Sequence, residues 1–321
     1  MKIVITGGGG FIGFKLAKAL LARGTLAAER IARLTLVDQA FPAGLPEDPR
    51  LERLAGDISD PGFAARAIAA DTTSIFHLAA VVSGAAEADF DLGMRVNLGG
   101  MRAVLDQARK CVHPPRLVFA SSVAAFGGDL PRVLDDSTTP APQTSYGSQK
   151  VIGEYLVSDF SRKGYVDGRS LRLPTIVVRP GKPNAAASSF ASAVVREPLN
   201  RIPYECPLPP ETGVWLLSPR RVVEALIHAY DLPASEWGWN RVVNLPGITV
   251  TVAEMIAAMG KIAGSEVAKR VSWKPDARIE AIVKTWPVRF ATTRALELGF
   301  KADPDIETVI RDYIADEGIK L

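Results

Sequence analysis

The sequence predicts an α/β protein: a doubly wound parallel sheet followed by a smaller C-terminal α/β lobe. Three observations carry this prediction. Short apolar segments rich in β-branched residues alternate with helical patterns through the first half of the chain, and such alternation is typical of parallel sheets. A glycine-rich turn joins the first expected strand to the first expected helix. Beyond about residue 175 the alternation gives way to proline-rich loops and shorter elements, which indicates a second lobe.

The first strand and helix are separated by four consecutive glycines. Residues 3–5 (Ile-Val-Ile) are typical of a short buried strand, and a helical pattern covers residues 14–23. Glycine permits positive φ angles and lets a phosphate group approach the backbone, while the start of the helix offers free N–H groups to an anion. Two glycine registers fit, and both stay open: Gly8, Gly10 and Gly13, or Gly7, Gly10 and Gly13.

The second expected strand, residues 34–37, ends on Asp38. A carboxylate at this place can accept hydrogen bonds from both hydroxyls of an adenosine ribose. Strand, glycine turn, helix, strand and acid in this order form the dinucleotide-binding unit of a Rossmann-type fold. The same charge repels a 2′-phosphate, and neither Gln39 nor Ala40 offers a cation. The sequence therefore predicts NAD, rather than NADP, as the cofactor.

The alternation continues to about residue 175. Strands are expected at residues 51–55, 74–78, 116–120 and 171–173, and helices at 61–69, 88–110 and 145–162. Asp60 before Pro61 favours the start of a helix, because aspartate caps the N-terminus and proline suits the first turn. Ligands of such sheets bind at the carboxyl ends of the strands, so the ends of these strands are where the site is expected.

The rest of the chain is expected to form the smaller lobe. Residues 181–213 contain six prolines and are interpreted as loop-rich. Helices are then expected at 219–230, 252–263 and 304–315, and strands at 214–217, 242–245 and 271–273. We therefore expect an NAD-binding domain over residues 1–175 and a substrate-binding lobe over residues 176–321, with an approximate boundary and elements that can interleave.

The composition is that of an ordinary globular protein, with 47% hydrophobic and 23% charged residues. A net charge of +3 without a basic run gives no indication of nucleic acid. Cys111 and Cys206 make neither a disulfide framework nor a metal motif, and the three histidines are scattered, so no metal is expected. No signal peptide and no membrane-spanning run is expected, which favours the cytoplasm.

Tyr146 and Lys150 are four positions apart and share one face of the expected helix 145–162. A phenol with an ordinary pKa near 10 is a weak base at neutral pH. A neighbouring ammonium group and the positive nicotinamide ring would lower that pKa, which would let Tyr146 accept a proton. Ser122, at the carboxyl end of the strand 116–120, can orient the oxygen of a substrate. The sequence predicts these three residues as the catalytic set.

These motifs together resemble the extended short-chain dehydrogenases/reductases of the NAD-dependent epimerase/dehydratase family. The matching segments are 5–13, Asp38, 56–58, 77–80, Asn97, 121–122, Tyr146 with Lys150, and 172–174. The resemblance implies that Lys150 also holds the nicotinamide ribose. The cofactor-binding residues that it implies are Gly7, Gly10, Phe11, Ile12, Gly13, Asp38, Asp57, Ile58, Leu78, Ala79, Ala80, Asn97, Ser122, Tyr146, Lys150, Pro174 and Ile176.

One departure from the family pattern narrows the chemistry. Val123 and Ala124 stand where the sugar-nucleotide dehydratases carry an Asp-Glu pair that removes water. The chain is therefore not expected to perform 4,6-dehydration.

Longer segments resemble those members of the family that oxidise the four-carbon sugar acid D-erythronate at its 2-hydroxyl, which gives 2-dehydro-D-erythronate. They lie at 81–84, 88–91, 173–175, 179–181, 183–190 and 215–220. A small carboxylate needs a cation, ideally a guanidinium group that can form two hydrogen bonds. The expected substrate-binding residues are Ser83, Ser122, Tyr146, Thr175, Arg179, Asn184 and Arg220.

Two other functions stay open. An epimerase acting on a nucleotide sugar uses the same catalytic residues but retains its NAD and returns the hydride. A non-catalytic NAD sensor could use the same fold, although a sensor has no need of all three catalytic residues.

The resemblance also implies a homodimer that pairs through the helices expected at 88–110 and 145–162. Their apolar residues Val104, Leu105, Val151 and Tyr155 are interpreted as exceeding what packing against the sheet requires.

Overall fold

A computed structural model describes residues 1–181 and 188–321. The chain divides into two compact units whose segments alternate along the sequence. The first unit contains residues 1–125, 144–172 and 223–243, and the second contains residues 126–143, 173–222 and 244–321. Each unit is thus assembled from segments that are far apart in the chain.

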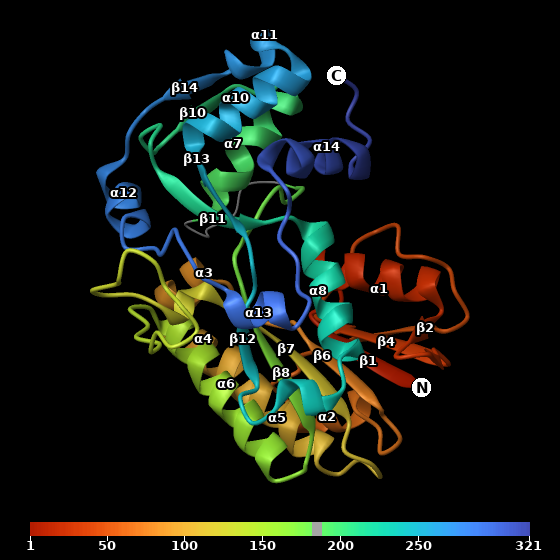
Figure 1. The fold of residues 1–321 in the computed structure, drawn as a ribbon. Helices are drawn as coiled ribbons and strands as arrows, with labels where there is room; N and C mark the ends of the chain where they lie inside the picture. Colours follow the sequence, from red (N-terminus) through yellow and green to blue (C-terminus); the bar gives the residue numbers. More distant parts are fainter. Residues whose placement is uncertain (182–187) are drawn as a thin grey trace. The chain divides into compact units, whose positions relative to one another are not determined.

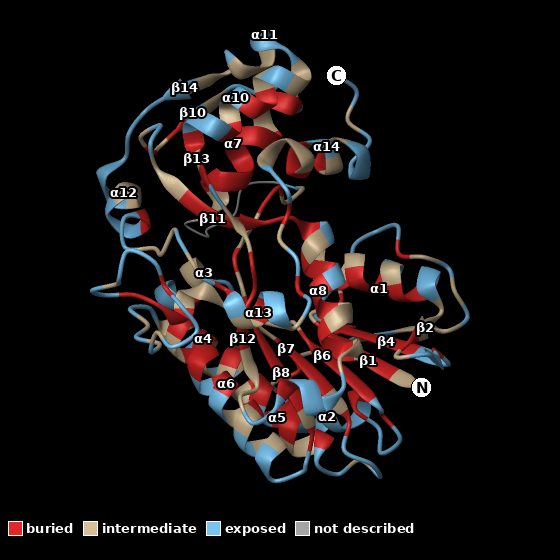
Figure 2. Ribbon diagram, viewed as in Figure 1, coloured by how far each residue is buried: buried red, intermediate tan, exposed pale blue. Residues whose placement is uncertain are grey.

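The first unit is built on a seven-stranded sheet in the order β12-β8-β7-β6-β1-β4-β5 (Figure 1). β1 pairs in parallel with β4 and β6, β4 with β5, and β6 with β7. Figure 2 shows most of the inner strands as buried, as the apolar β-branched runs require. The strands are β1 (Lys2–Thr6), β4 (Arg33–Asp38), β5 (Leu51–Ala55), β6 (Ser74–His77), β7 (Arg116–Ser122), β8 (Asp167–Leu173) and β12 (Val242–Asn244).

Helices cover this sheet, and the doubly wound α/β prediction is confirmed. Asp60 caps α2 as expected, with its side chain accepting a hydrogen bond from the Phe63 N–H at 2.6 Å. The helices are α1 (Phe11–Arg23), α2 (Pro61–Ala67), α3 (Ser83–Ala88), α4 (Phe90–Gly93), α5 (Gly100–Ala108), α6 (Ser145–Arg162), α8 (Pro219–Asp231) and α9 (Ala234–Trp237). A short hairpin joins β2 (Thr25–Leu26) to β3 (Glu29–Arg30), and a 3₁₀ turn, Val123–Ala125, follows β7.

The single helix expected at 88–110 is instead divided. α3 ends at Ala88, and Asp89 then caps a new helix by accepting a hydrogen bond from the Leu92 N–H at 2.9 Å. A π-helical segment, Met94–Gly99, separates α4 from α5. The apolar periodicity continues through this region, so the sequence pattern does not indicate the π-helical segment.

The apolar residues predicted to exceed the needs of the sheet are mostly buried inside the first unit. Val104 and Leu105 are fully buried and Val151 is 9% exposed. Tyr155 is 67% exposed, and its neighbour Ile152 is 40% exposed. The interpretation of Val104, Leu105 and Val151 as surplus surface is therefore wrong, because α5 and α6 use them to fill the core of the unit.

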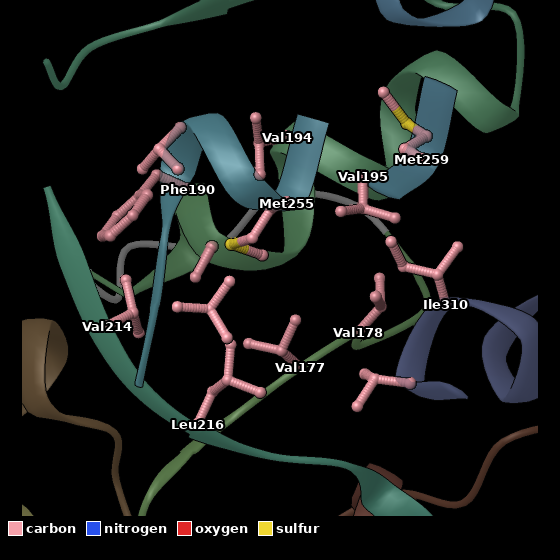
Figure 3. Packing of buried hydrophobic residues seen from close by; sticks show 14 of the residues in the cluster. Val177, Val178, Phe190, Val194, Val195, Val214, Leu216, Met255, Met259 and Ile310 are labelled. Carbon is pink, nitrogen blue, oxygen red and sulfur yellow. The ribbon is translucent and has the colours of Figure 1, made fainter. Parts of the chain in front are cut away.

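The second unit has its own core, to which a three-stranded sheet in the order β13-β11-β9 contributes Val214, Leu216 and Val250. Figure 3 shows part of this core. β11 pairs in parallel with β9 and antiparallel with β13, and β10 pairs in parallel with β14. The strands are β9 (Thr175–Ile176), β10 (Tyr204–Cys206), β11 (Gly213–Leu217), β13 (Ile248–Thr251) and β14 (Val271–Trp273). The helices are α7 (Ser189–Leu199), α10 (Val252–Ala263), α11 (Ser265–Ala268), α12 (Ala277–Val283), α13 (Thr293–Glu297) and α14 (Ile306–Asp316).

Residues 188–213 include a helix that the prolines of this region do not indicate. This helix is α7, whose apolar residues Phe190, Val194 and Val195 enter the core that Figure 3 shows. Pro198 lies in the last turn of this helix. Because the helix ends at Leu199, the proline disturbs few of its backbone hydrogen bonds. The expectation of a loop-rich segment did not include this helix.

Candidate active site

The glycine-rich turn between β1 and α1 is packed tightly against backbone. Gly7 has a φ of +72°, and a Cβ on it would lie 2.6 Å from the Ala79 nitrogen. A Cβ on Gly13 would lie 2.2 Å from the Gly7 oxygen. Gly10 is the N-cap of α1, and its carbonyl accepts a hydrogen bond from the Phe14 N–H at 2.8 Å. Because Gly13 belongs to both registers, the choice depends on the first glycine, and the positive φ of Gly7 favours the register that includes Gly7.

Asp38 ends β4 beside this turn. Its Oδ2 accepts a hydrogen bond from the Gly9 N–H at 3.0 Å, and its Oδ1 accepts one from the Gln39 N–H at 2.7 Å. Each carboxylate oxygen has two lone pairs, so each keeps one acceptor site for a further donor. The backbone thus fixes the carboxylate in one orientation at the carboxyl edge of the sheet.

Asp57 and Ile58 follow β5. Asp57 accepts hydrogen bonds from the Ser59 N–H at 2.9 Å and the Ser59 hydroxyl at 2.7 Å, and it pairs with Arg95 at 3.0 Å. Burial alone would raise the pKa of Asp57, but the bonds from Ser59 and the charge of Arg95 outweigh burial and lower it. The carboxylate of Asp57 is therefore charged at neutral pH. The next residue, Ile58, is buried.

Residues 78–80 follow β6, and Asn97 of the π-helical segment forms hydrogen bonds with the backbone of the next residue, Val81. Its Oδ1 accepts a hydrogen bond from the Val81 N–H at 2.7 Å, and its Nδ2 donates to the Val81 carbonyl at 3.1 Å. The same Nδ2 donates to Oε1 of Gln149 on α6 at 2.7 Å. Asn97 therefore ties the segment after β6 to the helix that carries the catalytic candidates.

The three predicted catalytic residues meet where β7 ends beside α6. The Ser122 side chain lies close enough to the Tyr146 phenol to affect its pKa. Lys150 donates from Nζ to the Ala120 carbonyl at 2.8 Å, and Nζ lies 5.4 Å from the centre of the Tyr146 ring. It also lies 4.8 Å from the centre of the Phe119 ring. A hydroxyl donor, a phenol and an ammonium group thus gather within the first unit.

Burial dominates the proton affinities of this set. It raises the pKa of Tyr146 to about 12, against the opposing effect of the hydrogen bond with Ser122. It lowers the pKa of Lys150 to about 8, and the charge of Glu154 opposes that change. The expectation that Lys150 and the positive nicotinamide ring together lower the Tyr146 pKa stays a prediction, because burial sets this pKa in the chain without NAD.

His77, at the end of β6, is buried beside this set. Its Nδ1 shares a hydrogen bond of 2.7 Å with the Thr6 hydroxyl, and its ring stacks on Phe119 with the centroids 5.7 Å apart. Burial, with a smaller effect from the charge of Lys150, lowers the pKa of His77 to about 3. In the described part of the chain Nε2 has no hydrogen-bond partner. The imidazole is therefore neutral.

The other predicted substrate and cofactor residues are divided between the two units. Ser83 begins α3 in the first unit. Thr175 and Ile176 form β9 of the second unit, directly after Pro174. Asn184 lies outside the described residues.

The two predicted substrate arginines, both in the second unit, differ in their partners. Arg179 is half-buried, and burial lowers its pKa. Its guanidinium group donates to the Ser188 hydroxyl at 3.2 Å, and no acidic side chain of residues 1–181 and 188–321 pairs with it. Arg220 is already engaged by two aspartates of α14: Asp312 at 2.5 Å and Asp316 at 2.5 Å. Of the two, Arg179 is the guanidinium group without a carboxylate partner in the described structure.

Comparison with known proteins decides the family. The chain matches the model of the NAD dependent epimerase/dehydratase family over residues 3–210. It belongs to this family. NAD is therefore its cofactor, as the sequence predicts.

Full-length relatives add a narrower similarity. The chain is 55% identical over 323 residues to the D-erythronate dehydrogenase of Cupriavidus necator, covering 99% of each chain. It is 44% identical to the D-erythronate dehydrogenase of Haemophilus influenzae, over 98% of this chain and 99% of that one. The solved structure of the nucleoside-diphosphate-sugar epimerase from Agrobacterium tumefaciens is similar with a TM-score of 0.94 and 41% identity, covering 100% and 95% of the two chains. The predicted resemblance to D-erythronate dehydrogenases is confirmed.

The residues of this family member fit a dinucleotide. At Gly7 and Gly13 any side chain would collide with neighbouring backbone atoms. A pyrophosphate-binding turn requires this tight packing of glycines. Gly10 places no side chain over the start of α1, whose N–H groups favour an anion. Asp38 keeps acceptor sites for ribose hydroxyls. These four residues would hold the phosphate and adenosine parts of NAD.

The sequence analysis missed one charged group at the site. Glu154, on α6, is 3% exposed and pairs with Arg172 at 2.6 Å. The signal that could have found it is its spacing, because an acid four residues after Lys150 lies on the same helix face. Sequence alone does not show that this face is buried.

The described residues were also compared with the requirements of a metal site and of a membrane-spanning helix. Within residues 1–181 and 188–321, no group of three histidine, cysteine, aspartate or glutamate side chains could hold a metal ion. In the same residues no helix is both long and apolar enough to span a membrane.

Proposed function

We propose that this protein oxidises D-erythronate at its 2-hydroxyl to 2-dehydro-D-erythronate, with NAD as the hydride acceptor. The observation that carries the proposal is 55% identity to a D-erythronate dehydrogenase over 99% of both chains. The gathering of Ser122, Tyr146 and Lys150 supports it, because a dehydrogenase needs all three and a sensor does not. NAD, when bound, takes up the hydride that leaves C2.

Each catalytic residue has a distinct part. Tyr146 accepts the proton of the 2-hydroxyl as the carbonyl forms, which is general-base catalysis. Ser122 lies close to Tyr146, and its hydroxyl orients the substrate oxygen. Lys150 keeps a positive charge near the phenol ring, 5.4 Å from its centre, where a cation favours the phenolate.

We further propose that Arg179 binds the carboxylate of the substrate. A half-buried guanidinium group without an acidic partner among the described residues suits a carboxylate ligand, since charge-assisted pairs of this type are strong and directional. Arg220, with two aspartates at 2.5 Å, would first have to give up an existing pair. Arg179 is the better candidate for this reason.

An epimerase acting on a nucleotide sugar is the second candidate. It is favoured by the 41% identity to a structure described as a nucleoside-diphosphate-sugar epimerase. The two candidates differ in what happens to the hydride: a dehydrogenase releases NADH, whereas an epimerase returns the hydride to the sugar.

The deciding experiment follows NADH absorbance with a panel of aldonic acids, and separately follows epimer formation with a panel of nucleotide sugars. We expect NADH to form with D-erythronate and only weakly with longer aldonic acids. Epimer formation from a nucleotide sugar, without net NADH, would overturn the dehydrogenase proposal and support the second candidate.

For assembly and location, we propose a homodimer in the cytoplasm. The exposed apolar residues Ile152 and Tyr155 on α6 support pairing through this helix, because exposed apolar patches commonly mark contact surfaces. Light scattering at micromolar concentration should give the mass of two chains, and Tyr155→Asp should reduce it to one. Tyr165→Asp, at another exposed tyrosine, should leave the mass unchanged. A monomeric wild-type protein would contradict the dimer.

A further inference from the structure

A buried ion pair lies one helical turn beyond the catalytic lysine. Glu154 is 3% exposed, and its Oε1 accepts hydrogen bonds from the Ser121 hydroxyl at 2.5 Å and from Arg172 Nε at 2.9 Å. A second nitrogen of Arg172 donates to Oε2 at 2.6 Å. Buried pairs are weak contributors to stability, since well-packed apolar side chains often serve as well. Stability alone therefore gives a poor account of this pair.

The pair joins three elements at the catalytic groups. Glu154 lies on α6, Ser121 on β7 directly before Ser122, and Arg172 on β8, which neighbours β7 in the sheet. The bond from Ser121 to Glu154 is thus a second attachment of α6 to β7, beside the bond from Lys150 to the β7 backbone. A shift of α6 along β7 would break both.

Glu154 also brings a negative charge close to Lys150. Burial lowers the pKa of Lys150 to about 8, and the charge of Glu154 opposes this. The other titratable groups that face Lys150 are Tyr146 on the same helix and His77 on β6. Both are uncharged at neutral pH, since their pKa values are about 12 and about 3. Arg172 adds a positive charge that is paired with Glu154.

We propose that Glu154 is a positioning residue of the active site: its carboxylate, held by Ser121 and Arg172, fixes α6 on the end of β7 and stabilises the Lys150 ammonium group. The inference rests on the proposed function only for the part it gives to Lys150. Glu154 acts through Lys150 and need not touch the substrate or NAD.

The first test measures the protonation of Lys150 directly. Lysine labelled with ¹³C at Cε is titrated by NMR, and the Lys150 signal is identified by its absence in Lys150→Arg. In Glu154→Gln we expect this signal to titrate at least about one pH unit lower than in the wild type, a tenfold change in the acid dissociation constant. Titration at the wild-type pH would overturn the proposal.

A second variant covers the case in which the first does not fold. Glu154→Gln leaves the guanidinium group of Arg172 buried and unpaired, whereas Glu154→Gln combined with Arg172→Met removes both charges. In the double variant Lys150 should also titrate below the wild-type pH, by a smaller amount. If the double variant folds and Lys150 titrates as in the wild type, the electrostatic role is wrong.

Activity gives an independent measure. In Glu154→Gln we expect kcat to fall at least tenfold while the KM for NAD changes little. The rise of the rate with pH should move to higher pH, because a less charged Lys150 favours the Tyr146 phenolate less. Glu154→Asp should restore part of both. Glu280→Gln, which removes the acid of a surface pair with Lys284 at 2.7 Å, is the matched control and should behave as wild type.

The two proposals fail in different ways. If the wild-type protein forms no NADH with any aldonic acid, the proposed function is wrong, but the Lys150 titration still decides the role of Glu154. If NADH forms and the Glu154 variants keep the wild-type titration and pH profile, the positioning role is wrong and the proposed function stands.

Discussion

Lys150 donates a hydrogen bond from its ammonium group to the backbone carbonyl of Ala120, at 2.8 Å. Ala120 lies two residues before Ser122 on β7, and Lys150 lies one turn after Tyr146 on α6. The lysine that supports the phenol is therefore attached to the strand that carries the serine. A strand and a helix from separate parts of the chain thus set the spacing of one catalytic set, as precise sites on rigid elements require.

Cofactor choice should depend on Asp38. Replacing it with Ala removes the acceptor for the ribose hydroxyls and the charge that repels a 2′-phosphate. Loss of a hydrogen bond to a charged group costs about 1.5–3 kcal/mol, so the KM for NAD should rise about tenfold to a hundredfold and the preference over NADP should shrink. Initial rates with the two cofactors measure this.

A carboxylate variant elsewhere in the first unit provides the control. Asp71→Ala removes an exposed acid that pairs with Lys2, and it should leave both KM values unchanged. Equal kcat/KM for NAD and NADP in the wild-type protein would contradict the role given to Asp38.

Binding of the substrate carboxylate should depend on Arg179. Arg179→Gln keeps hydrogen-bonding capacity but loses the charge, so we expect the KM for D-erythronate to rise about tenfold to a hundredfold with the affinity for NAD unchanged. Arg311→Gln, at a surface arginine paired with Glu307, is the control. If Arg220→Gln has the larger effect on KM, the carboxylate belongs to Arg220 instead.

The free energy of unfolding at acid pH should depend on the protonation of His77. Its pKa is about 3 in the folded protein and about 6.5 in an unfolded chain. Between these values the unfolded chain binds a proton that the folded chain does not, so the free energy of unfolding falls as the pH drops from about 6.5 towards 3. Urea titrations at several pH values should give a shallower fall for His77→Gln.

The exposed histidine His113 supplies the comparison. His113→Gln should retain the wild-type slope, because this substitution leaves the buried imidazole of His77 in place. An unchanged slope in His77→Gln would show that carboxylates alone account for the acid sensitivity.

The sequence predicted the fold and the catalytic set for an identifiable reason. Turn glycines, a strand-end acid and a Tyr–Lys pair at helical spacing are local patterns, which can be recognised without knowing how distant segments pack. Gly7 shows this directly, since its φ of +72° is an angle that other residues rarely adopt.

What the sequence missed depends on contacts between distant segments. The ion pair of Glu154 with Arg172 joins α6 to β8, and neither residue shows alone that it is buried. The division of the helix at Asp89 and the order of α7 depend on capping and on packing into a core. The pKa of Tyr146 could not be predicted either, because burial raises it and spacing carries no information on burial.

The decisive variant for the chemistry is Tyr146→Phe. The ring is retained, so packing and NAD binding should be nearly unchanged, but no group accepts the proton of the 2-hydroxyl. Loss of a positioned acid–base group costs about a hundredfold to ten-thousandfold in rate. Tyr155→Phe, at an exposed tyrosine on the same helix, is the matched control and should keep the wild-type kcat.

The pH dependence of the wild-type rate tests the same residue independently. Burial raises the pKa of Tyr146 to about 12, so in the chain by itself the phenol is protonated at neutral pH. Because oxidation needs the phenolate as proton acceptor, the rate should rise with pH. In Lys150→Ala the rise should move to higher pH, since a cation near the ring is lost. Single-turnover rates across the alkaline range, with saturating NAD, measure the shift. A Tyr146→Phe enzyme that keeps most of the wild-type kcat and the same pH profile would place the base at another residue.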